Sequence, residues 1–312
     1  MNRPLLLGTR PSKMAMVMAQ QAKALVESLG APHTLEIRPF ASEGDKNQGD
    51  LKKLGGKGAF VKDLEQRLLN GEIDCAIHCL KDIPGDIPMH PDLAIMCFLE
   101  RDDPRDALIM GNGKSAPKKG DGQGFTLATS SPRRLALLKH LYPGVNIIPL
   151  RGNVDTRMRK LMDGEFDGMV LSYAGLERLN LQQHATHIYE PEEMLPAVGQ
   201  GTLVLQVRRE DIPKCPYLRE INSLHTETVA AAEREMLRLL DGNCHSAIAG
   251  YAEKTMQGFK LRGLVAALDG GVVLHAESEG NDTLTLGRQV AENLIAQGAK
   301  ELIDAPLKAC GS

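Results

Sequence analysis

Basic side chains recur where short apolar runs give way to helical patterns. They are Arg10 after LLLGT, Lys81 after CAIHC, Arg133 and Arg134 after FTLATS, Arg151 and Arg157 after VNIIPL, and Arg178 after GMVLS. In open α/β sheets, ligands bind beyond the carboxyl ends of the strands, which is where these residues would lie. Guanidinium groups bind carboxylates and phosphates through paired hydrogen bonds, so the pattern predicts an anionic ligand.

Among these strand ends, the stretch SSPRR (130–134) allows the most detailed prediction of an anion site. Ser131 is expected to cap a helix with Pro132 at its first position. Arg133 and Arg134 then lie in the first turn, where each positive charge opposes the helix dipole by roughly 0.3–1 kcal/mol. Either this is a solvated basic helix start, or an anion binds the N–H groups and both side chains. The recurrence of such sites favours the anion, and replacing either arginine with Leu should then leave stability nearly intact.

Asp82 is an acid within this basic set. It is either a helix cap or a salt-bridge partner of Lys81, or it has a role in chemistry. In an arginine-lined cleft, neighbouring positive charge would keep its carboxylate ionised. It would then suit a cation that develops during a reaction.

The cysteine of LLDGNCHSAIAG (239–250) lies in a turn. Cys244 follows Gly242 and Asn243, at the end of an apolar helical run. A structural thiol would be expected in the middle of a strand or helix. The position of Cys244 therefore predicts a thiol that a ligand can reach.

Alternating apolar runs and helical patterns are typical of βαβ units and a mainly parallel sheet. Strands are expected at 5–9, 33–40, 75–80, 125–130, 145–150 and 168–172, with a first helix at 12–30. A helix ending near residue 240, a strand-like stretch at 260–278 and a helix around 285–303 indicate a small α+β domain.

Composition excludes several classes of protein. The chain has 312 residues, 42% hydrophobic and 25% charged, which suits two or three globular domains. A net charge of −3 argues against a polyanion-binding protein, and 4% aromatic residues without Trp argue against base stacking. The apolar runs are too short to span a bilayer, and no secretory signal is evident. The expected location is cytoplasmic, with the six cysteines as thiols.

Two further motifs carry less information. GGKGAF (55–60) lacks the pattern of a phosphate-binding loop, so Lys53 and Lys57 are only candidates for a flexible basic lid. CAIHC (75–79) would place both its cysteines on one face of a strand, which indicates core packing. No metal site is expected, since no second Cys/His pair completes a tetrahedral set.

Together these residues resemble the porphobilinogen deaminase (hydroxymethylbilane synthase) family of tetrapyrrole biosynthesis. The resemblance covers nearly the whole chain. It includes GTRPSKMAMVMAQ, GGKGAFVKDLE, HCLKDIP, TSSPRR, LRGNVDTRMRKL, AGLERL, PAVGQGTLVLQVR and LDGNC. Some of these motifs are modest individually, and their order makes the resemblance specific.

The resemblance implies an α/β fold with two doubly wound domains like those of periplasmic binding proteins. A small C-terminal α+β domain would carry the cofactor cysteine. Domain 1 would combine residues 1–100 with 200–219 and form the cleft wall with the catalytic Asp. Domain 2, at 101–199, would form the arginine-rich wall, and domain 3 would span 220–312.

The resemblance also implies the chemistry. A dipyrromethane cofactor, made from the enzyme's own substrate, would be attached to Cys244 through a thioether. Four porphobilinogen molecules would then be condensed head to tail, each losing ammonia to give an azafulvenium cation. Hydrolysis would release hydroxymethylbilane. Asp82 would be catalytic, because its carboxylate would stabilise the cation and handle protons.

Every pyrrole ring brings an acetate and a propionate, which basic side chains would bind. The implied cofactor-binding residues are Lys81, Ser131, Arg133, Arg134 and Arg157. The implied substrate-binding residues are Arg10, Ser12, Lys53, Lys57, Arg151 and Arg178. The sequence departs from the family pattern at three positions. Asn243 replaces Gly or Ser, Ala247 replaces Pro, and Gln206 stands where Glu is common.

Two other functions fit part of the pattern. A small-anion-binding protein of the solute-binding type would explain the arginines but not Cys244. A Cys/His hydrolase would use Cys244 and His245, although adjacent residues rarely present thiol and imidazole to each other. Within the family, the expected partners are porphobilinogen and, for the product, uroporphyrinogen-III synthase. A monomer that binds neither nucleic acid nor membrane is expected.

Overall fold

The computed structural model describes residues 3–30, 33–41, 58–85, 87–111, 113–242 and 245–305. Packing divides the chain into two compact units. The first unit combines residues 1–102 with 201–228, and the second combines 103–200 with 229–312. The chain thus passes from one unit to the other more than once. The three predicted domains and their boundaries stay a prediction.

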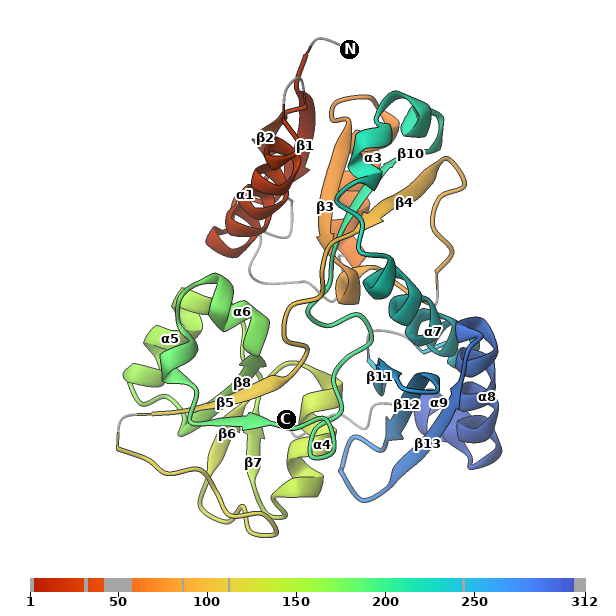
Figure 1. Cartoon of the computed structure of the whole chain (residues 1–312). Helices are drawn as coiled ribbons and strands as arrows, with labels where there is room; N and C mark the ends of the chain where they lie inside the picture. Colours follow the sequence, from red (N-terminus) through yellow and green to blue (C-terminus); the bar gives the residue numbers. More distant parts are fainter. Residues whose placement is uncertain are drawn as a thin grey trace. The chain divides into compact units, whose positions relative to one another are not determined.

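The first unit is built on a five-stranded sheet in the order β2-β1-β3-β10-β4 (Figure 1). Its strands are β1 (Leu5–Thr9), β2 (Leu35–Pro39), β3 (Cys75–Cys79), β4 (Leu93–Phe98) and β10 (Leu203–Arg208). β1 pairs in parallel with β2 and β3, whereas β10 runs antiparallel to β3 and β4.

Apolar residues cover both faces of this sheet. On one face, Cys75 and Ile77 pack in a cluster with residues of α1 (Lys13–Ser28). On the other, Ala76 packs against Leu64 of α3 (Gly58–Leu69). The alternation of side chains along β3 therefore places His78 on the α3 face. The 3₁₀ turns η1 (Leu80–Asp82), η3 (Arg209–Lys214) and η4 (Pro216–Arg219) complete the unit.

The second unit contains a five-stranded sheet in the order β7-β6-β8-β5-β9. Its strands are β5 (Asp106–Met110), β6 (Thr126–Ala128), β7 (Asn146–Ile148), β8 (Gly168–Ser172) and β9 (His187–Tyr189). β6 pairs in parallel with β7 and β8, and β5 runs antiparallel to β8 and β9. Position by position, this topology repeats that of the first sheet, with β5 in the place of β10. Its helices are α4 (Pro132–Leu141), α5 (Val154–Met162), α6 (Tyr173–Arg178) and the 3₁₀ turn η2 (Gln182–His184).

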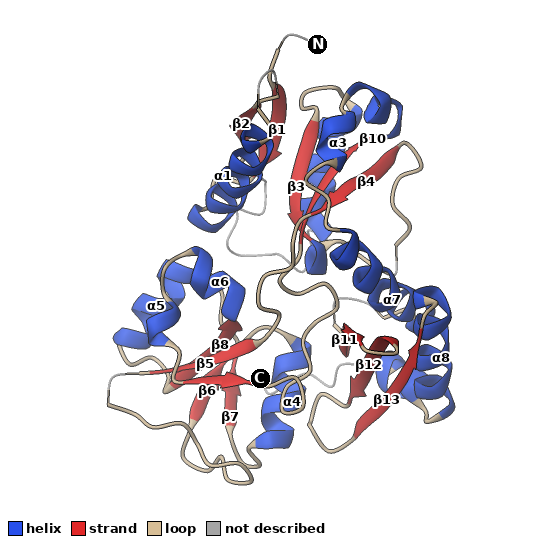
Figure 2. Cartoon of the chain, viewed as in Figure 1, coloured by secondary structure: helices blue, strands red, loops and turns tan. Residues whose placement is uncertain are grey.

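The C-terminal part of the chain forms a three-stranded antiparallel sheet with helices packed on it (Figure 2). Its elements are α7 (Leu224–Leu240), β11 (Ala247–Thr255), β12 (Gly258–Ala266), β13 (Val273–Gly280), α8 (Thr283–Ala296) and α9 (Ala299–Asp304). Met236, Leu261 and Val290 are fully buried in the shared core.

The predicted fold class is confirmed, with two mainly parallel α/β sheets and a small C-terminal α+β part. The strands expected before residue 175 are present. The stretch at 260–278 forms a hairpin, because Gly270, with a φ of 77°, turns the chain between β12 and β13. Gly298, with a φ of 96°, likewise separates α8 from α9, where one final helix was expected.

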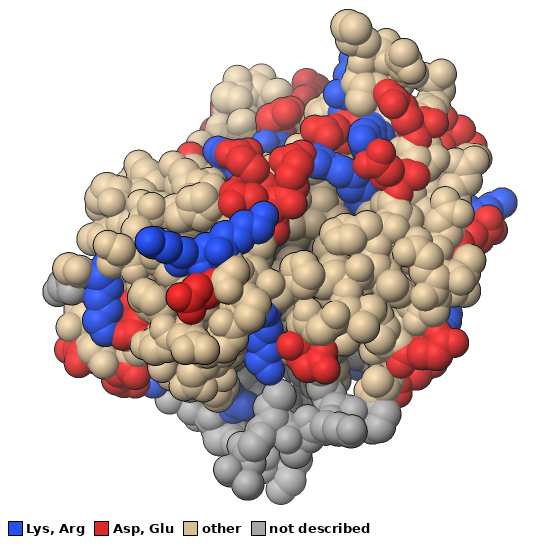
Figure 3. Space-filling model, turned by 90° about the horizontal axis from the view of Figure 1, so that it is seen from below, with Lys and Arg blue, Asp and Glu red and all other residues tan. Residues whose placement is uncertain are grey.

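Among the described residues, no helix is long and apolar enough to cross a bilayer. On the face drawn in Figure 3, Lys and Arg side chains lie beside Asp and Glu. This mixture of signs is consistent with the small net charge of −3.

Candidate active site

The carboxyl ends of β1 and β3 lie at one edge of the first sheet, because these strands pair in parallel. Arg10 follows β1 directly, and Lys81 and Asp82 follow β3 in η1. Ser12 caps α1 by accepting a hydrogen bond of 3.3 Å from the Ala15 N–H. The topology thus brings four of the predicted site residues to one edge, while their roles stay predictions.

Asp82 is half-buried at the end of η1. In the part of the chain that the structure describes, its carboxylate forms no hydrogen bond and no ion pair. It is the last residue of the turn and not its N-cap. Neither a cap nor a salt bridge to Lys81 is therefore found among the described residues. That this carboxylate meets a ligand stays a prediction.

The second sheet has a comparable edge, because β6 pairs in parallel with β7 and β8. Ser131 follows β6 and caps α4, with Pro132 in the first turn, as predicted. Arg151 follows β7 and is exposed, whereas Arg178, at the end of α6 after β8, is half-buried. Basic residues therefore follow all three parallel strands at this edge.

Arg133 and Arg134 converge on Asp106, the first residue of β5. Arg134 donates hydrogen bonds of 3.0 Å from Nε and 2.7 Å from Nη2 to Asp106 Oδ1. Arg133 Nη1 lies 2.7 Å from Asp106 Oδ2, and Gln200 Nε2 donates to Oδ1 at 2.9 Å. Burial alone would raise the pKa of Asp106, but the two arginine charges lower it well below its ordinary value.

This cluster corrects the interpretation of SSPRR. Arg133 and Arg134 are only 4% and 8% exposed, and the anion at this helix start is a carboxylate of the chain itself. Because both arginines are buried in ion pairs, their removal is now expected to cost stability, contrary to the expectation from the sequence. Arg133 Nε is buried without a hydrogen-bond partner among the described residues, so one donor remains for a carboxylate from outside. The role of this pair in cofactor binding stays a prediction.

Arg157 lies in α5, half-buried. Its Nε donates a hydrogen bond of 2.8 Å to the Gly152 carbonyl. Burial, and then the positive charge of Arg134, lower the pKa of Arg157. Two guanidinium groups that repel each other in partly buried surroundings are stabilised when an anion binds near them. Arg157 therefore suits the predicted anionic ligand.

The turn that carries Cys244 is described only at its two ends. Asp241, with a φ of 52°, ends α7 in the left-handed region, and Gly242 is buried. A Cβ on Gly242 would lie 1.9 Å from the Ile248 side chain, so glycine suits this close approach. Cys244 and Asn243 lie outside the described residues, as do Lys53 and Lys57 of the predicted lid.

Three of the four described cysteines are unlike a cofactor anchor, and the fourth, Cys79, is half-buried. Cys75, Cys97 and Cys215 are buried in the first unit. Burial raises the pKa of the Cys97 thiol to about 12 and that of Cys215 to about 11. Because the thiolate is the nucleophile, these thiols are poorly suited to forming a thioether.

Sequence reasoning missed Asp106 and did not recognise the polar role of His78. Asp106 ends the charged run RDDPRD, where nothing marks one acid as buried except the apolar run that follows. The sequence analysis assigned no role to His78, which is buried with its Nε2 3.0 Å from Gln206 Oε1. The contacts of Asp106 and of His78 are both made with residues far away in the sequence.

Two solved structures illustrate what the fold is similar to. A TRAP periplasmic solute binding protein from Desulfovibrio salexigens is 13% identical, with a TM-score of 0.44 over 76% of this chain and 75% of its own. The periplasmic VFT2 domain of Bordetella pertussis BvgS is 15% identical, with a TM-score of 0.45 over 75% of this chain and 93% of its own.

Family models and relatives cover most of the chain. "Porphobilinogen deaminase, dipyromethane cofactor binding domain" matches residues 5–214, and "Porphobilinogen deaminase, C-terminal domain" matches residues 228–296. The porphobilinogen deaminase of Bacillus mycoides is 40% identical over 98% of this chain and 99% of its own. Porphobilinogen deaminase 2 of Streptomyces coelicolor is 38% identical over 95% of each chain. With both family domains matched in order, the chain belongs to the porphobilinogen deaminase family of enzymes.

Proposed function

We propose that this chain condenses four porphobilinogen molecules with loss of ammonia and releases hydroxymethylbilane, with Asp82 as the catalytic carboxylate. The observation that carries the assignment of Asp82 is its half-buried carboxylate, which no described residue pairs with. Arg10 and Lys81 follow the ends of strands at the same edge of the sheet. An acid in this position can stabilise positive charge that develops as the substrate loses ammonia.

The substrate amine is an ammonium at neutral pH, so it can leave without first receiving a proton from the enzyme. The main task for Asp82 is then electrostatic, toward the cationic pyrrole and its N–H. In the same proposal, Arg10, Ser12, Arg151 and Arg178 bind substrate carboxylates, and Lys53 and Lys57 act as a basic lid.

The donor set fits a dipyrromethane, which brings four carboxylates on two rings. Arg157 has a pKa lowered by burial and by Arg134, and Arg133 retains an unpartnered buried Nε among the described residues. We assign cofactor binding to these residues together with Lys81, Ser131 and Arg134, and covalent attachment to Cys244. When bound, the dipyrromethane supplies the pyrrole carbon to which the first substrate is joined. The residues of the chain hold its carboxylates and orient it.

We further propose that the enzyme acts as a cytoplasmic monomer. Its product, a linear tetrapyrrole that still has to be closed, would pass to uroporphyrinogen-III synthase. Sedimentation of the purified chain tests the monomer, and product transfer in a coupled assay tests the second step.

The reaction itself is tested by incubating purified protein with porphobilinogen. Ammonia and a linear tetrapyrrole should appear in a ratio of about four to one, as four condensations require. Acidic aldehyde reagent should colour the protein before substrate is added, because a bound dipyrrole reacts with it. Binding of porphobilinogen without ammonia release would instead indicate an anion-binding protein.

A further inference from the structure

The short helix α9 makes a polar contact with the end of α7, the helix that precedes Cys244. α7 ends at Leu240, and the carbonyls in the last turn of a helix have no partner within the helix. Lys300, in the first turn of α9, donates a hydrogen bond of 2.9 Å from Nζ to the Leu240 carbonyl. A lysine is well suited to this place, because its charge also complements the negative end of the helix dipole. The contact joins two helices that are far apart in the sequence.

α9 is itself fixed to the C-terminal part of the chain. Ala299 is fully buried and packs in one cluster with Leu240 and Ile248. Just before α9, Gln297 Nε2 donates a hydrogen bond of 2.9 Å to the His275 carbonyl on β13. The lysine therefore extends from an anchored helix, which allows it to hold the last carbonyl of α7 in place.

The turn between α7 and β11 borders α9 on both of its stems. The first stem contains Gly242, two residues after the carbonyl that Lys300 binds. A Cβ on Gly242 would lie 1.9 Å from the side chain of Ile248, so the two stems pack closely. A cavity of about 300 Å³ lies between residues 245–247 of the second stem and residues 302–305 at the end of α9. A shift at the end of α7 would therefore move both stems.

We propose that Lys300 is a positioning residue for attachment of the dipyrromethane, because it fixes the stem that leads to Cys244. The inference rests on the proposed attachment to Cys244. In that step the sulfur of Cys244 bonds to the aminomethyl carbon of porphobilinogen as the carbon–nitrogen bond breaks. The ammonia that leaves and the proton of the thiol together make ammonium. A thiol on a loosely held stem spends less time at the short distance that this step needs.

Lys300→Met tests the proposal, since it removes the donor and nearly keeps the length of the side chain. Apoprotein is produced in cells that cannot make porphobilinogen and is then mixed with porphobilinogen. Intact mass follows the fraction of molecules that carry dipyrromethane. Loading should be about tenfold slower than in wild type, the order expected when one charge-assisted hydrogen bond is lost. Turnover per loaded molecule should change much less, because the attached cofactor is then also held through its carboxylates.

Two further variants separate positioning from stability. Lys300→Arg keeps the charge and a donor, so it should load at nearly the wild-type rate. The matched control is Lys254→Met, at an exposed position on β11, where loading should be unchanged. Thermal unfolding measures the stability of each apoprotein. If Lys300→Met unfolds at a lower temperature but loads at the wild-type rate while folded, the contact only stabilises the domain and the proposal is overturned.

If Lys300→Met does not fold, Lys300→Gln replaces it in the same assay. Its donor is on a shorter side chain, so it should load more slowly than Lys300→Arg, and equal rates would overturn the proposal. If wild-type apoprotein gains no mass from porphobilinogen, the proposed attachment fails and this inference fails with it. If wild type loads and all Lys300 variants load equally fast, only the role of Lys300 is refuted.

Discussion

At the scale of single residues, two kinds of charged side chain follow the strands. Asp82 is half-buried and has no partner among the described residues, which is typical of a group that meets a ligand. Arg134 is buried and bound on several sides by groups of the chain, including the Val170 carbonyl at 3.0 Å. Spacing alone does not distinguish them, since both follow a parallel strand. Their predicted responses to mutation are opposite.

Asp82→Asn should lower turnover about 10²–10³-fold, because it removes the charge that stabilises the developing cation while keeping the size of the side chain. Substrate binding should change much less, and the fold should be retained. Single-turnover kinetics on pre-assembled holoenzyme measures the effect, with circular dichroism as the folding control. Asp82→Glu should keep more activity than Asn. Turnover of the Asn variant within a few-fold of wild type would show that the carboxylate has no such role.

Arg134→Leu should destabilise the protein by about 3–5 kcal/mol, because it breaks a buried pair and leaves Asp106 short of a partner. The matched control is Arg151→Leu, at an exposed position on the same edge, where the change should remain within about 0.5 kcal/mol. Urea unfolding of both variants measures the difference. Equal stability of the two would contradict a structural role for the buried cluster. A defect in turnover for Arg151→Leu alone would assign ligand binding to the exposed arginine.

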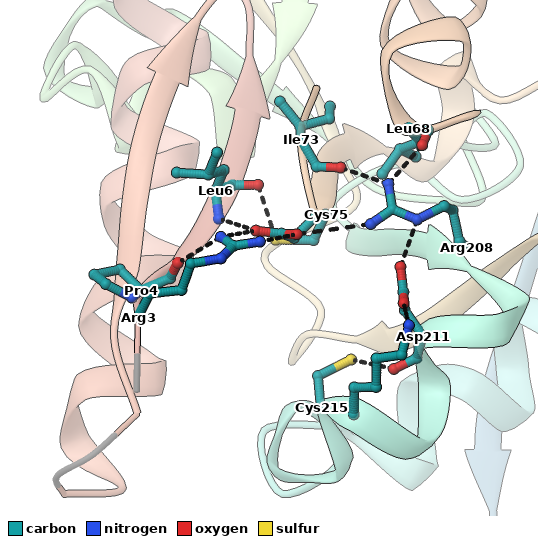
Figure 4. A network of polar contacts seen from close by, with 11 residues as sticks. Arg3, Pro4, Leu6, Leu68, Ile73, Cys75, Arg208, Asp211 and Cys215 are labelled. Carbon is teal, nitrogen blue, oxygen red and sulfur yellow. Dashed lines mark hydrogen bonds and ion pairs between the residues drawn. The ribbon is translucent and has the colours of Figure 1, made fainter. Parts of the chain in front are cut away.

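At the scale of elements, the first unit is held together by a polar network at the end of the sheet opposite Asp82 (Figure 4). Asp74 accepts hydrogen bonds from Arg3 Nη1 at 2.7 Å and from the Leu6 N–H at 2.8 Å. Arg208 lies 3.6 Å from the same carboxylate and also donates to the Ile73 carbonyl at 2.7 Å. The network therefore ties β1, β3 and β10 together.

Asp74→Asn should destabilise the protein at pH 7, and the difference from wild type should shrink as pH falls below the ordinary pKa of an Asp carboxyl. Burial alone would raise the pKa of Asp74, but its bonds to Arg3 and Leu6, with the charges of Arg3 and Arg208, lower it below 3.8. A depressed carboxyl pKa contributes stability above the unfolded value that is lost as pH falls through the folded value. Thermal unfolding from pH 7 to 3 should show the gap between the two proteins beginning to narrow below about pH 4. A constant gap would mean that the carboxylate charge is not what stabilises the network.

At the scale of the whole molecule, sequence periodicity predicted the parallel strands and the edge to which they bring charges. It could not place β5 or β10, which become antiparallel members of their sheets only because the chain moves between the two units. Likewise, Asp106 pairs with Arg134 across 28 positions and Gln206 pairs with His78 across 128. A local sequence pattern cannot identify partners so far apart. These buried polar pairs were therefore recognised only in the folded chain.

The central claim is that Cys244 carries the dipyrromethane. Peptide mapping must separate it from Cys310, which also lies outside the described residues. The most direct measurement is the intact mass of freshly purified protein, followed by mapping of the modified peptide. The mass should exceed that of the 312-residue chain by one dipyrromethane, located on Cys244, and Cys244→Ser should be folded, unmodified and inactive. Full activity in a protein of unmodified mass, or the added mass on any other residue, would contradict the claim.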